Sequence, residues 1–317
     1  MKQLECLARE NGFDRAYLLP IPAFVQWRAR ATSPVYPHWE KVLSALDGIP
    51  ENARSVLLLV RAYRPYRVIP GEATISAYYV ASNAAYFGAH ALIQGLLKLC
   101  VDARASNLPA KQLVSGFGIG TYGRNGLCAI PPFGTRFVLE TVLTDLPPEV
   151  EMCAWQEDAG FSPACANCTA CMSGCPSAAL NGSSRVDMEV CLRARARNLS
   201  PAPPDASKRE IGNCIWGCEF CQDVCPRNQK ITPVDMPAAV REAIALERLL
   251  QGEVDALAGW IGTNCASKGR MRARACIVAG NLRRADLRSE ILPLLGDPES
   301  GVRECARWAL DQIRESG

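Results

Sequence analysis

The chain has 317 residues and a formal net charge of +3, with 49% hydrophobic and 21% charged residues. This is the composition of an ordinary globular protein of two or three domains, and the charge neither requires nor excludes a nucleic-acid partner. No apolar run reaches the roughly 18 to 20 residues of a membrane span, and the first residues, MKQLECLARENGFD, show no secretory signal. We therefore expect a cytoplasmic protein with no membrane partner.

Helices and strands alternate in the first half of the chain. Apolar runs predict strands at residues 16–19, 54–61 and 136–145. Apolar residues at helical spacing predict helices at residues 4–11 and 82–100. Ser82 or Asn83 is a suitable N-cap for the longer helix, because either side chain can accept a hydrogen bond from a free backbone N–H group. The alternation predicts an α/β domain over residues 1–155.

A glycine-rich stretch, SGFGIGTYGRNGL, occupies residues 115–127. Successive glycines let backbone amides approach a large ligand closely. A dinucleotide-binding site is not favoured, because no clear strand leads into the stretch and no convincing acidic residue follows at the expected distance. The alternative is a plain loop that crosses close to another segment of the chain.

Seven of the 16 cysteines follow ferredoxin spacing. Four form C-x2-C-x2-C-x3-C followed by proline and three form a shorter version, at Cys165, Cys168, Cys171 and Cys175 and at Cys218, Cys221 and Cys225. In bacterial two-cluster ferredoxins the cysteine before the proline binds the other cluster. Two 4Fe-4S clusters need eight thiolates, so Cys191 or Cys214 supplies the last. A zinc site is the alternative, but it closes with four ligands and leaves the rest of the run unexplained.

We thus predict a bacterial ferredoxin-like module with two 4Fe-4S clusters over residues 156–232. The remaining cysteines lie mostly in apolar or helical contexts, which is typical of small buried side chains. These are Cys6, Cys100, Cys128, Cys153, Cys265, Cys276 and Cys305.

Residues 233–317 are predicted to be α-helical. The segment ILPLLGDPESGVRECARWALDQI reads as a helix, an aspartate-proline turn and a second helix from Val302, which is typical of HEAT-like repeats. Basic residues gather in this region, at Lys268, Arg270, Arg272, Arg274, Arg283, Arg284 and Arg288. They predict either a face that contacts RNA phosphates or an ordinary solvated helical face.

Together these motifs resemble the epoxyqueuosine reductase family. IGNCIWGCEFCQDVCPRN and CANCTACMSGCPSAAL resemble its two cluster motifs, and GIGTYGRNGL resembles its glycine loop. GRMRARACIVAGN and VRECARWAL resemble its C-terminal repeat motifs. Cys191 falls where the family has a lone cysteine between the cluster motifs, so the resemblance implies that Cys191, rather than Cys214, is the eighth ligand.

The resemblance implies an oxidoreductase that reduces epoxyqueuosine to queuosine in tRNA. It implies an α/β reductase domain that binds cobalamin, a corrinoid, as in reductive dehalogenases. Residues of the glycine loop would hold the corrinoid, namely Gly118, Gly120, Gly123, Arg124 and Asn125. One cluster would use Cys165, Cys168, Cys171 and Cys225, and the other Cys175, Cys191, Cys218 and Cys221. We expect a monomer that binds tRNA through the basic C-terminal region and takes electrons from a low-potential donor such as ferredoxin or flavodoxin.

The family's general acid is an aspartate that precedes the glycine loop. Counting back from Gly118 to that position reaches Arg104, and Asp102 lies two residues earlier, so Asp102 is our candidate acid. Tyr122 is the alternative proton donor, or else a packing aromatic. Two further functions stay open: a corrinoid-dependent reductase of a small molecule, and a two-cluster electron-transfer protein without corrinoid.

Overall fold

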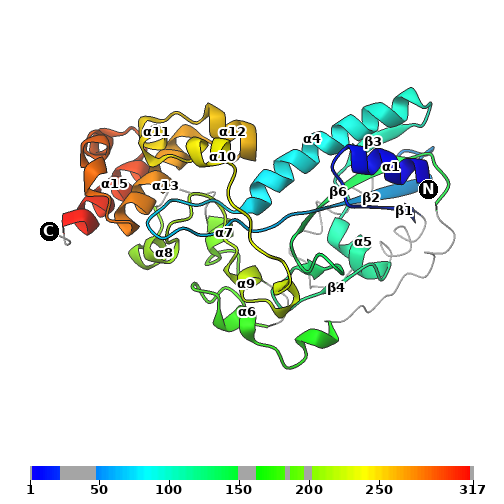
Figure 1. Cartoon of the computed structure of the whole chain (residues 1–317), viewed down its shortest axis with the longest axis horizontal. Helices are drawn as coiled ribbons and strands as arrows, with labels where there is room; N and C mark the ends of the chain where they lie inside the picture. Colours follow the sequence, from blue (N-terminus) through cyan, green and yellow to red (C-terminus); the bar gives the residue numbers. More distant parts are fainter. Residues whose placement is uncertain (1, 22–47, 149–161, 183–185, 196–201, 315–317) are drawn as a thin grey trace. The chain divides into compact units, whose positions relative to one another are not determined.

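The computed structural model describes residues 2–21, 48–148, 162–182, 186–195 and 202–314 (Figure 1). The chain forms two compact units. Unit 1 consists of Met1–Tyr63, Ala84–Thr169 and Gly182–Arg185, and unit 2 of Arg64–Asn83, Ala170–Asn181 and Val186–Gly317. Each unit is assembled from several segments, because the chain passes from one to the other repeatedly. The three consecutive domains expected from the sequence stay a prediction.

Unit 1 contains a four-stranded sheet in the order β1-β2-β6-β3. Its strands are β1 (Arg15–Pro20), β2 (Ser55–Ala62), β6 (Phe137–Thr144) and β3 (Ala103–Ser106). The mixture of helix and strand confirms the coarse prediction. The neighbouring strands pair antiparallel, however, whereas a regular alternation of strands and helices usually gives a parallel sheet.

The central strand β2 is buried on both faces. Val56, Leu58 and Val60 belong to a core cluster that includes Leu113 and Val114 of α5 (Ala110–Gly116). Side chains alternate along a strand, so Leu57 and Leu59 face the other way, and they are equally buried. This double burial explains why β2 reads as an unbroken apolar run.

Two helices of unit 1 pack closely against each other. They are α1 (Lys2–Glu10) and residues 84–98 of α4 (Ala77–Lys98). A Cβ atom at Gly95 would lie 3.2 Å from Cδ1 of Leu7, and one at Gly88 would lie 2.4 Å from the carbonyl oxygen of Asn11. Glycine at these positions therefore lets α4 approach α1 and the turn that follows it.

The start of α4 corrects one prediction. The helix begins at Ala77, so Ser82 and Asn83 lie inside it and neither is its N-cap. The N-terminus is instead satisfied within unit 2, where Glu219 Oε1 accepts hydrogen bonds from Ser76 Oγ at 2.5 Å and from the backbone N–H of Tyr78 at 3.2 Å. A carboxylate far along the chain therefore does what a local side chain was expected to do.

Unit 2 is helical. Its short helices near the cysteines are α6 (Ala170–Ser173), α7 (Leu192–Arg195), α8 (Asp205–Glu210) and α9 (Phe220–Asp223). The C-terminal region contains α10 (Ala238–Ala243), α11 (Leu246–Gln251), α12 (Asp255–Ile261), α13 (Lys268–Asn281), α14 (Arg288–Ile291) and α15 (Ser300–Arg314). Short 3-10 turns lie at Pro226–Asn228, Ala285–Leu287 and Leu292–Gly296. The helical C-terminal region was predicted, and α15 begins two residues before the expected Val302.

The core of unit 2 is built around α13. Its residues Ala275–Gly280 are completely or almost completely buried, and they share one apolar cluster with α15 and with Ile215 and Trp216. None of the helices in the described part of the chain is long and apolar enough to cross a membrane.

The contact between α13 and α15 gives a test of this packing. A Cβ atom at Gly280 would lie 2.7 Å from Cζ3 of Trp308, whereas one at Gly259, in α12, would meet nothing within 4 Å. Both sites are helical, so Gly→Ala brings the same gain in helix propensity at each. We expect Gly280→Ala to be less stable than Gly259→Ala by about 1–3 kcal/mol, the usual cost of overpacking a core. Urea denaturation followed by circular dichroism measures the difference, and equal stabilities would contradict the packing.

Candidate functional site

Two short helical turns carry cysteines in unit 2. Cys171 lies in α6 and Cys221 in α9, and each turn is followed by a Cys-Pro pair at Cys175 or Cys225. The two halves use the same backbone bond, because the N–H of Cys175 donates to Met172 and that of Cys225 to the carbonyl of Gln222, both at 3.2 Å. The sequence repeat is therefore also a structural repeat.

The two cysteine-bearing turns pack directly against each other. Gly174 and Val224 occupy equivalent positions, each immediately before the cysteine of its Cys-Pro pair. A Cβ atom at Gly174 would lie 2.8 and 2.9 Å from the two methyl carbons of Val224. Glycine is therefore required here if the turns are to stay this close.

Four thiols of unit 2 lie near one another. Burial raises the pKa of Cys218 to about 12, and the neighbouring thiols of Cys214, Cys191 and Cys175 raise it further. Burial also raises the pKa of Cys221 to about 12, and Cys218, Cys191, Cys171 and Cys175 add to that shift. Cys175, Cys191, Cys218 and Cys221, which we call the thiol quartet, are the ligands predicted for the second cluster.

Cys214 lies in a different environment from Cys191. Burial raises its pKa to about 11, and its thiol donates to the carbonyl oxygens of Trp216 at 3.4 Å and Gly217 at 3.7 Å. The thiol of Cys191 raises the pKa of both Cys218 and Cys221, whereas the thiol of Cys214 raises the pKa of Cys218 and is not among the causes for Cys221. Both thiols thus lie near Cys218, and the choice of Cys191 as the eighth ligand, which the family resemblance implies, stays a prediction.

The thiol quartet fits an iron–sulfur cluster by its chemistry. Burial and neighbouring thiols oppose the ionisation of Cys218 and Cys221, because a buried thiolate is poorly solvated and thiolates repel one another. Iron supplies the missing positive charge, and thiolate is its usual protein ligand in such clusters. Among the residues that the structure describes, no three His, Cys, Asp or Glu side chains are placed to hold a single metal ion. A cluster is larger than one ion, so its ligands need not converge on one point.

Glu219, which lies between Cys218 and Cys221, forms hydrogen bonds to the start of α4. The sequence analysis did not predict this role. Its carboxylate accepts from Ser76 and Tyr78, while its carbonyl accepts from the backbone N–H of Gln222 at 2.8 Å at the start of α9. Gly217 makes this approach feasible, since a Cβ atom there would lie 2.4 Å from Cβ of Ser76. The only sequence signal for this role was an acidic residue between two cluster cysteines.

In unit 1 the glycine loop holds the first two cysteines of the run. The backbone N–H of Ser162 donates to the carbonyl of Tyr122 at 2.9 Å, and Arg124 Nη2 donates to the carbonyl of Ala166 at 2.7 Å. Ala166 lies between Cys165 and Cys168. Cys165 and Cys168 belong to unit 1, and Cys171 and Cys225 to unit 2, so the ligand set of the first cluster stays a prediction.

The glycines of the loop serve its own packing. The loop runs from α5 through β4 (Thr121–Tyr122), which pairs with β5 (Cys128–Ala129). A Cβ atom at Gly120 would lie 2.4 Å from the carbonyl oxygen of Ala129, and one at Gly123 would lie 2.8 Å from Asn125 Oδ1. Gly118 has a positive φ of 65°, which suits glycine. A helix rather than a strand leads into the loop, in agreement with the sequence analysis, which did not favour a dinucleotide-binding site.

Asn125 is also used within the loop. Its side chain is buried, and Oδ1 accepts a hydrogen bond from the backbone N–H of Leu127 at 3.2 Å. Arg124, as described above, is bound to Ala166. Gly120, Gly123, Arg124 and Asn125 thus all have partners in the protein itself, as expected for a loop that crosses close to another segment.

The two candidate proton donors lie in different surroundings. Asp102 accepts hydrogen bonds from Asn52 Nδ2 at 2.5 Å and from Arg104 Nη2 at 3.2 Å, and these contacts hold its pKa below the usual range. A general acid needs the opposite shift, so this environment does not favour Asp102. Tyr122 is half-buried and packs against the apolar core of unit 1, which is the packing role considered for it.

Four arginines of the C-terminal basic cluster form hydrogen bonds or ion pairs with other groups of the protein. Arg274 is buried and donates to the carbonyl of Ile215, and Arg270 donates to two backbone carbonyls. Arg272 pairs with Asp297 at 3.0 Å, and Arg284 pairs with Glu247 and Asp286. These four arginines form contacts within unit 2, and an RNA-contacting face in this region stays a prediction.

The other cysteines divide into two groups. Cys128, Cys265, Cys276 and Cys305 are buried, as predicted for small apolar side chains. Cys6 and Cys100 are exposed, which corrects that prediction for both: Cys6 lies in the middle of α1, whose buried residues are Leu4 and Ala8, and Cys100 follows the end of α4. Cys153 lies outside the described residues.

The cysteine region matches a known domain family, and the chain is similar to curated proteins. Residues 164–228 match the family model of the 4Fe-4S double cluster binding domain. The curated epoxyqueuosine reductase of Staphylococcus aureus is 26% identical over 203 residues, which cover 62% of this chain and 51% of that protein. The chain therefore spans about half the length of the curated relatives it matches.

Solved structures share the fold over nearly the whole chain. The epoxyqueuosine reductase of Streptococcus thermophilus superposes with a TM-score of 0.71 at 19% identity, covering 99% of this chain and 90% of that one. Another epoxyqueuosine reductase, crystallised with an epoxyqueuosine-modified tRNA-Tyr stem loop, gives a TM-score of 0.70 at 21% identity and covers 98% and 89%.

Cluster ligation by Cys191 can be tested against Cys214. We expect Cys191→Ala to lose about half of the bound iron, because a cluster deprived of one thiolate is not retained. Cys214→Ala removes a neighbouring thiol that is bonded to backbone carbonyls, and it should keep the wild-type iron content. Iron and sulfide analysis after anaerobic purification decides between them, and the reverse pattern would overturn the assignment of the eighth ligand.

The packing of the two cysteine-bearing turns gives a second test. Gly174→Ala should push the turns apart, because the added methyl group would overlap the side chain of Val224. We expect this variant to lose iron to a chelator at least several-fold faster than wild type. The double variant Gly174→Ala/Val224→Ala restores the space and should recover most of the resistance. If the double variant loses iron as fast as the single one, the contact does not set the spacing of the turns.

Proposed function

We propose that this chain, which is related in sequence to curated epoxyqueuosine reductases and has their fold, is an iron–sulfur oxidoreductase that reduces epoxyqueuosine to queuosine in tRNA. The observation that carries the proposal is the thiol quartet, which lies within a double-cluster domain at residues 164–228. Because the chain spans about half the length of these relatives, substrate and partners belong to the proposal.

We assign the second cluster to Cys175, Cys191, Cys218 and Cys221, and the first to Cys165, Cys168, Cys171 and Cys225. The first assignment rests on ferredoxin spacing, in which the cysteine before each proline crosses to the other cluster. When bound, such clusters pass single electrons over short distances. The protein fixes the ligands through the Gly174 contact, the Glu219 bonds and the bond from Arg124 to Ala166.

Cobalamin is part of the proposal through the family resemblance of residues 118–127. Reduced cobalamin, when bound, would supply a strong nucleophile or reductant. All five residues proposed to hold it have contacts within the protein: Gly118 donates its backbone N–H to the carbonyl of Ser115 at 3.1 Å, and the other four have the contacts described above.

The remaining parts of the proposal follow from the same resemblance. The C-terminal helices α10–α15 would be HEAT-like, the protein would act as a monomer, and a ferredoxin or flavodoxin would deliver electrons. Of the proton donors, Asp102 has a pKa held below its usual range by hydrogen bonds from Asn52 and Arg104, which does not suit a general acid. Tyr122 is the other candidate, and its hydroxyl can donate a proton.

A second candidate function is favoured by the glycine loop. If its residues serve only packing and the support of Cys165 and Cys168, the chain would be a two-cluster electron-transfer protein without corrinoid. The same clusters would then reduce a partner protein. This alternative predicts that the protein does not bind cobalamin, and it predicts the same iron content.

Two measurements on the iron-loaded protein separate these functions. We expect added cobalamin to stay bound through gel filtration and to show its visible spectrum, and we expect tRNA carrying epoxyqueuosine to be converted to queuosine under a strong reductant. Intact clusters without any corrinoid signal would favour the electron carrier. Bound corrinoid without conversion, in the presence of an active control enzyme, would instead point to a small-molecule substrate.

A further inference from the structure

Three charged side chains are buried in the part of unit 2 that the structure describes: Lys208, Arg274 and Asp297. Lys208 pairs with Asp205 at 2.9 Å, and Asp297 pairs with Arg272 at 3.0 Å. Such partners are the rule, because a charge that leaves water loses its solvation and needs another group to stabilise it. A buried charge without a partner therefore requires an explanation.

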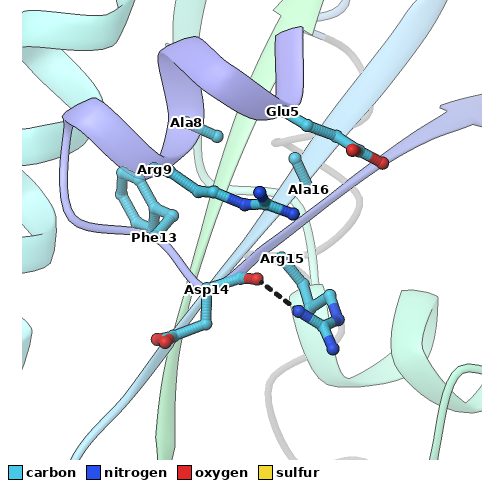
Figure 2. Close-up of a pocket in the computed structure, with 7 residues that line it drawn as sticks. All are labelled: Glu5, Ala8, Arg9, Phe13, Asp14, Arg15 and Ala16. Atoms are coloured by element: carbon cyan, nitrogen blue, oxygen red, sulfur yellow. Dashed lines mark hydrogen bonds between the residues drawn. The ribbon is translucent and has the colours of Figure 1, made fainter. Parts of the chain in front are cut away.

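Charges that gather at a pocket of unit 1 are also balanced. The pocket has a volume of about 220 Å³ and is formed by residues of α1, β1 and the turn that joins them (Figure 2). Its charged side chains are Glu5, Arg9, Asp14 and Arg15, and Arg15 Nη1 donates to the carbonyl of Asp14 at 2.9 Å. Because acidic and basic groups occur together here, the pocket does not select a ligand of either charge.

Arg274, on α13, is the buried charge of unit 2 that forms no ion pair with an aspartate or glutamate among the described residues. Its side chain is 2% exposed. The guanidinium donates from Nε to the carbonyl of Ile215 at 2.9 Å and from Nη2 to the carbonyl of Cys214 at 3.1 Å. Carbonyl oxygens satisfy N–H groups, but they do not cancel a full positive charge.

The ionisable groups around Arg274 are thiols and a phenol. Burial lowers the pKa of Arg274, whereas the neighbouring Cys214, Cys305, Cys218 and Tyr79 act to raise it. Groups of this kind are neutral at pH 7 unless something stabilises their anions. Cys218 belongs to the thiol quartet, and a cysteine that binds iron does so as a thiolate. Iron binding would therefore place negative charge near Arg274.

The hydrogen bonds of Arg274 hold the chain segment that leads into Cys218. Cys214 and Ile215, whose carbonyls it binds, come shortly before that cysteine in the sequence. The segment is also held by the start of α4, since the backbone N–H of Ile215 donates to the carbonyl of Thr74 at 2.8 Å. The guanidinium is thus fixed beside the segment that delivers a proposed cluster ligand.

We propose that Arg274 supplies the positive charge that balances the cluster of the thiol quartet, and that it thereby raises the reduction potential of that cluster. Four thiolates outweigh the positive charge of the iron–sulfide core, so the bound cluster is a net anion, and reduction adds another negative charge. A buried cation nearby stabilises the reduced state more than the oxidised state. The inference rests on the proposed function, because it requires a cluster at the quartet.

The test is a redox titration of the iron-loaded protein under anaerobic conditions, in which electron paramagnetic resonance reports the reduced fraction of each cluster. Arg274→Gln removes the charge and keeps an amide that can donate to a carbonyl. We expect the reduction equilibrium of one cluster to shift roughly tenfold toward the oxidised form, which lowers its potential by about 59 mV for a one-electron couple. The other cluster should keep its wild-type potential.

Two further variants separate the charge from the hydrogen bonds. Arg274→Lys keeps the positive charge but cannot reproduce the fork of the guanidinium, so it should show less than half of the shift. Arg284→Gln is the matched control, because it removes an arginine of the same region whose charge is already balanced by Glu247 and Asp286. It should leave both potentials unchanged.

Iron content decides the case in which Arg274→Gln does not keep its clusters. If Arg274→Lys keeps the iron that Arg274→Gln loses, the positive charge stabilises the bound cluster, as proposed. Equal potentials in the wild type and in Arg274→Gln would overturn the proposal. Equal shifts, or equal losses of iron, in the Gln and Lys variants would also overturn it, because the hydrogen bonds rather than the charge would then be responsible.

This result can be separated from the fate of the proposed function, because the titration needs neither tRNA nor cobalamin. If the protein fails to convert epoxyqueuosine but Arg274→Gln lowers one potential, the substrate assignment fails and the role of Arg274 stands. If the protein converts epoxyqueuosine while the variant keeps both potentials, the reductase stands and the role of Arg274 fails. A protein that binds no 4Fe-4S cluster would overturn both.

Discussion

The crowding of thiols in unit 2 is the constraint on which the rest of the site depends. Cys175, Cys191, Cys218 and Cys221 come from three separate segments, and burial together with the neighbouring thiols raises the pKa of Cys218 and Cys221. Iron binding requires thiolates, so metal and fold stabilise each other here. Gly174, Gly217 and Glu219 all serve this arrangement, because each allows or fixes a close approach of the cysteine-bearing segments.

Features governed by local chemistry could be predicted from the sequence. The apolar run of β2 predicted a buried strand, and the helical spacing of apolar residues after residue 82 predicted most of α4. The cysteine spacing indicated two clusters, because the length of each loop is set by the cluster it must enclose. Spacing left Cys191 and Cys214 open, and the family resemblance is what implies Cys191; both thiols lie near Cys218.

Features governed by distant contacts could not be predicted. The N-cap of α4 comes from Glu219, and a local reading of Ser82 and Asn83 cannot anticipate a carboxylate so far along the chain. The arginines of α13 looked like a solvent-facing cluster, yet Arg274 is buried because it satisfies a backbone carbonyl. The glycine loop was read either as a ligand cradle or as a loop that crosses close to another segment, and only the fold shows that the carbonyl of Ala129 leaves no room for a side chain at Gly120. In each case the role of the residue is set by the group that it contacts in the folded chain, and the local sequence does not show that contact.

The central claim is that this chain holds two clusters through eight cysteines, and a metal count tests it most directly. Iron and acid-labile sulfide, measured per chain on anaerobically reconstituted protein and joined with Mössbauer spectra, should give about eight of each in two 4Fe-4S clusters. A content of about four, or a single zinc ion in place of iron, would contradict the account.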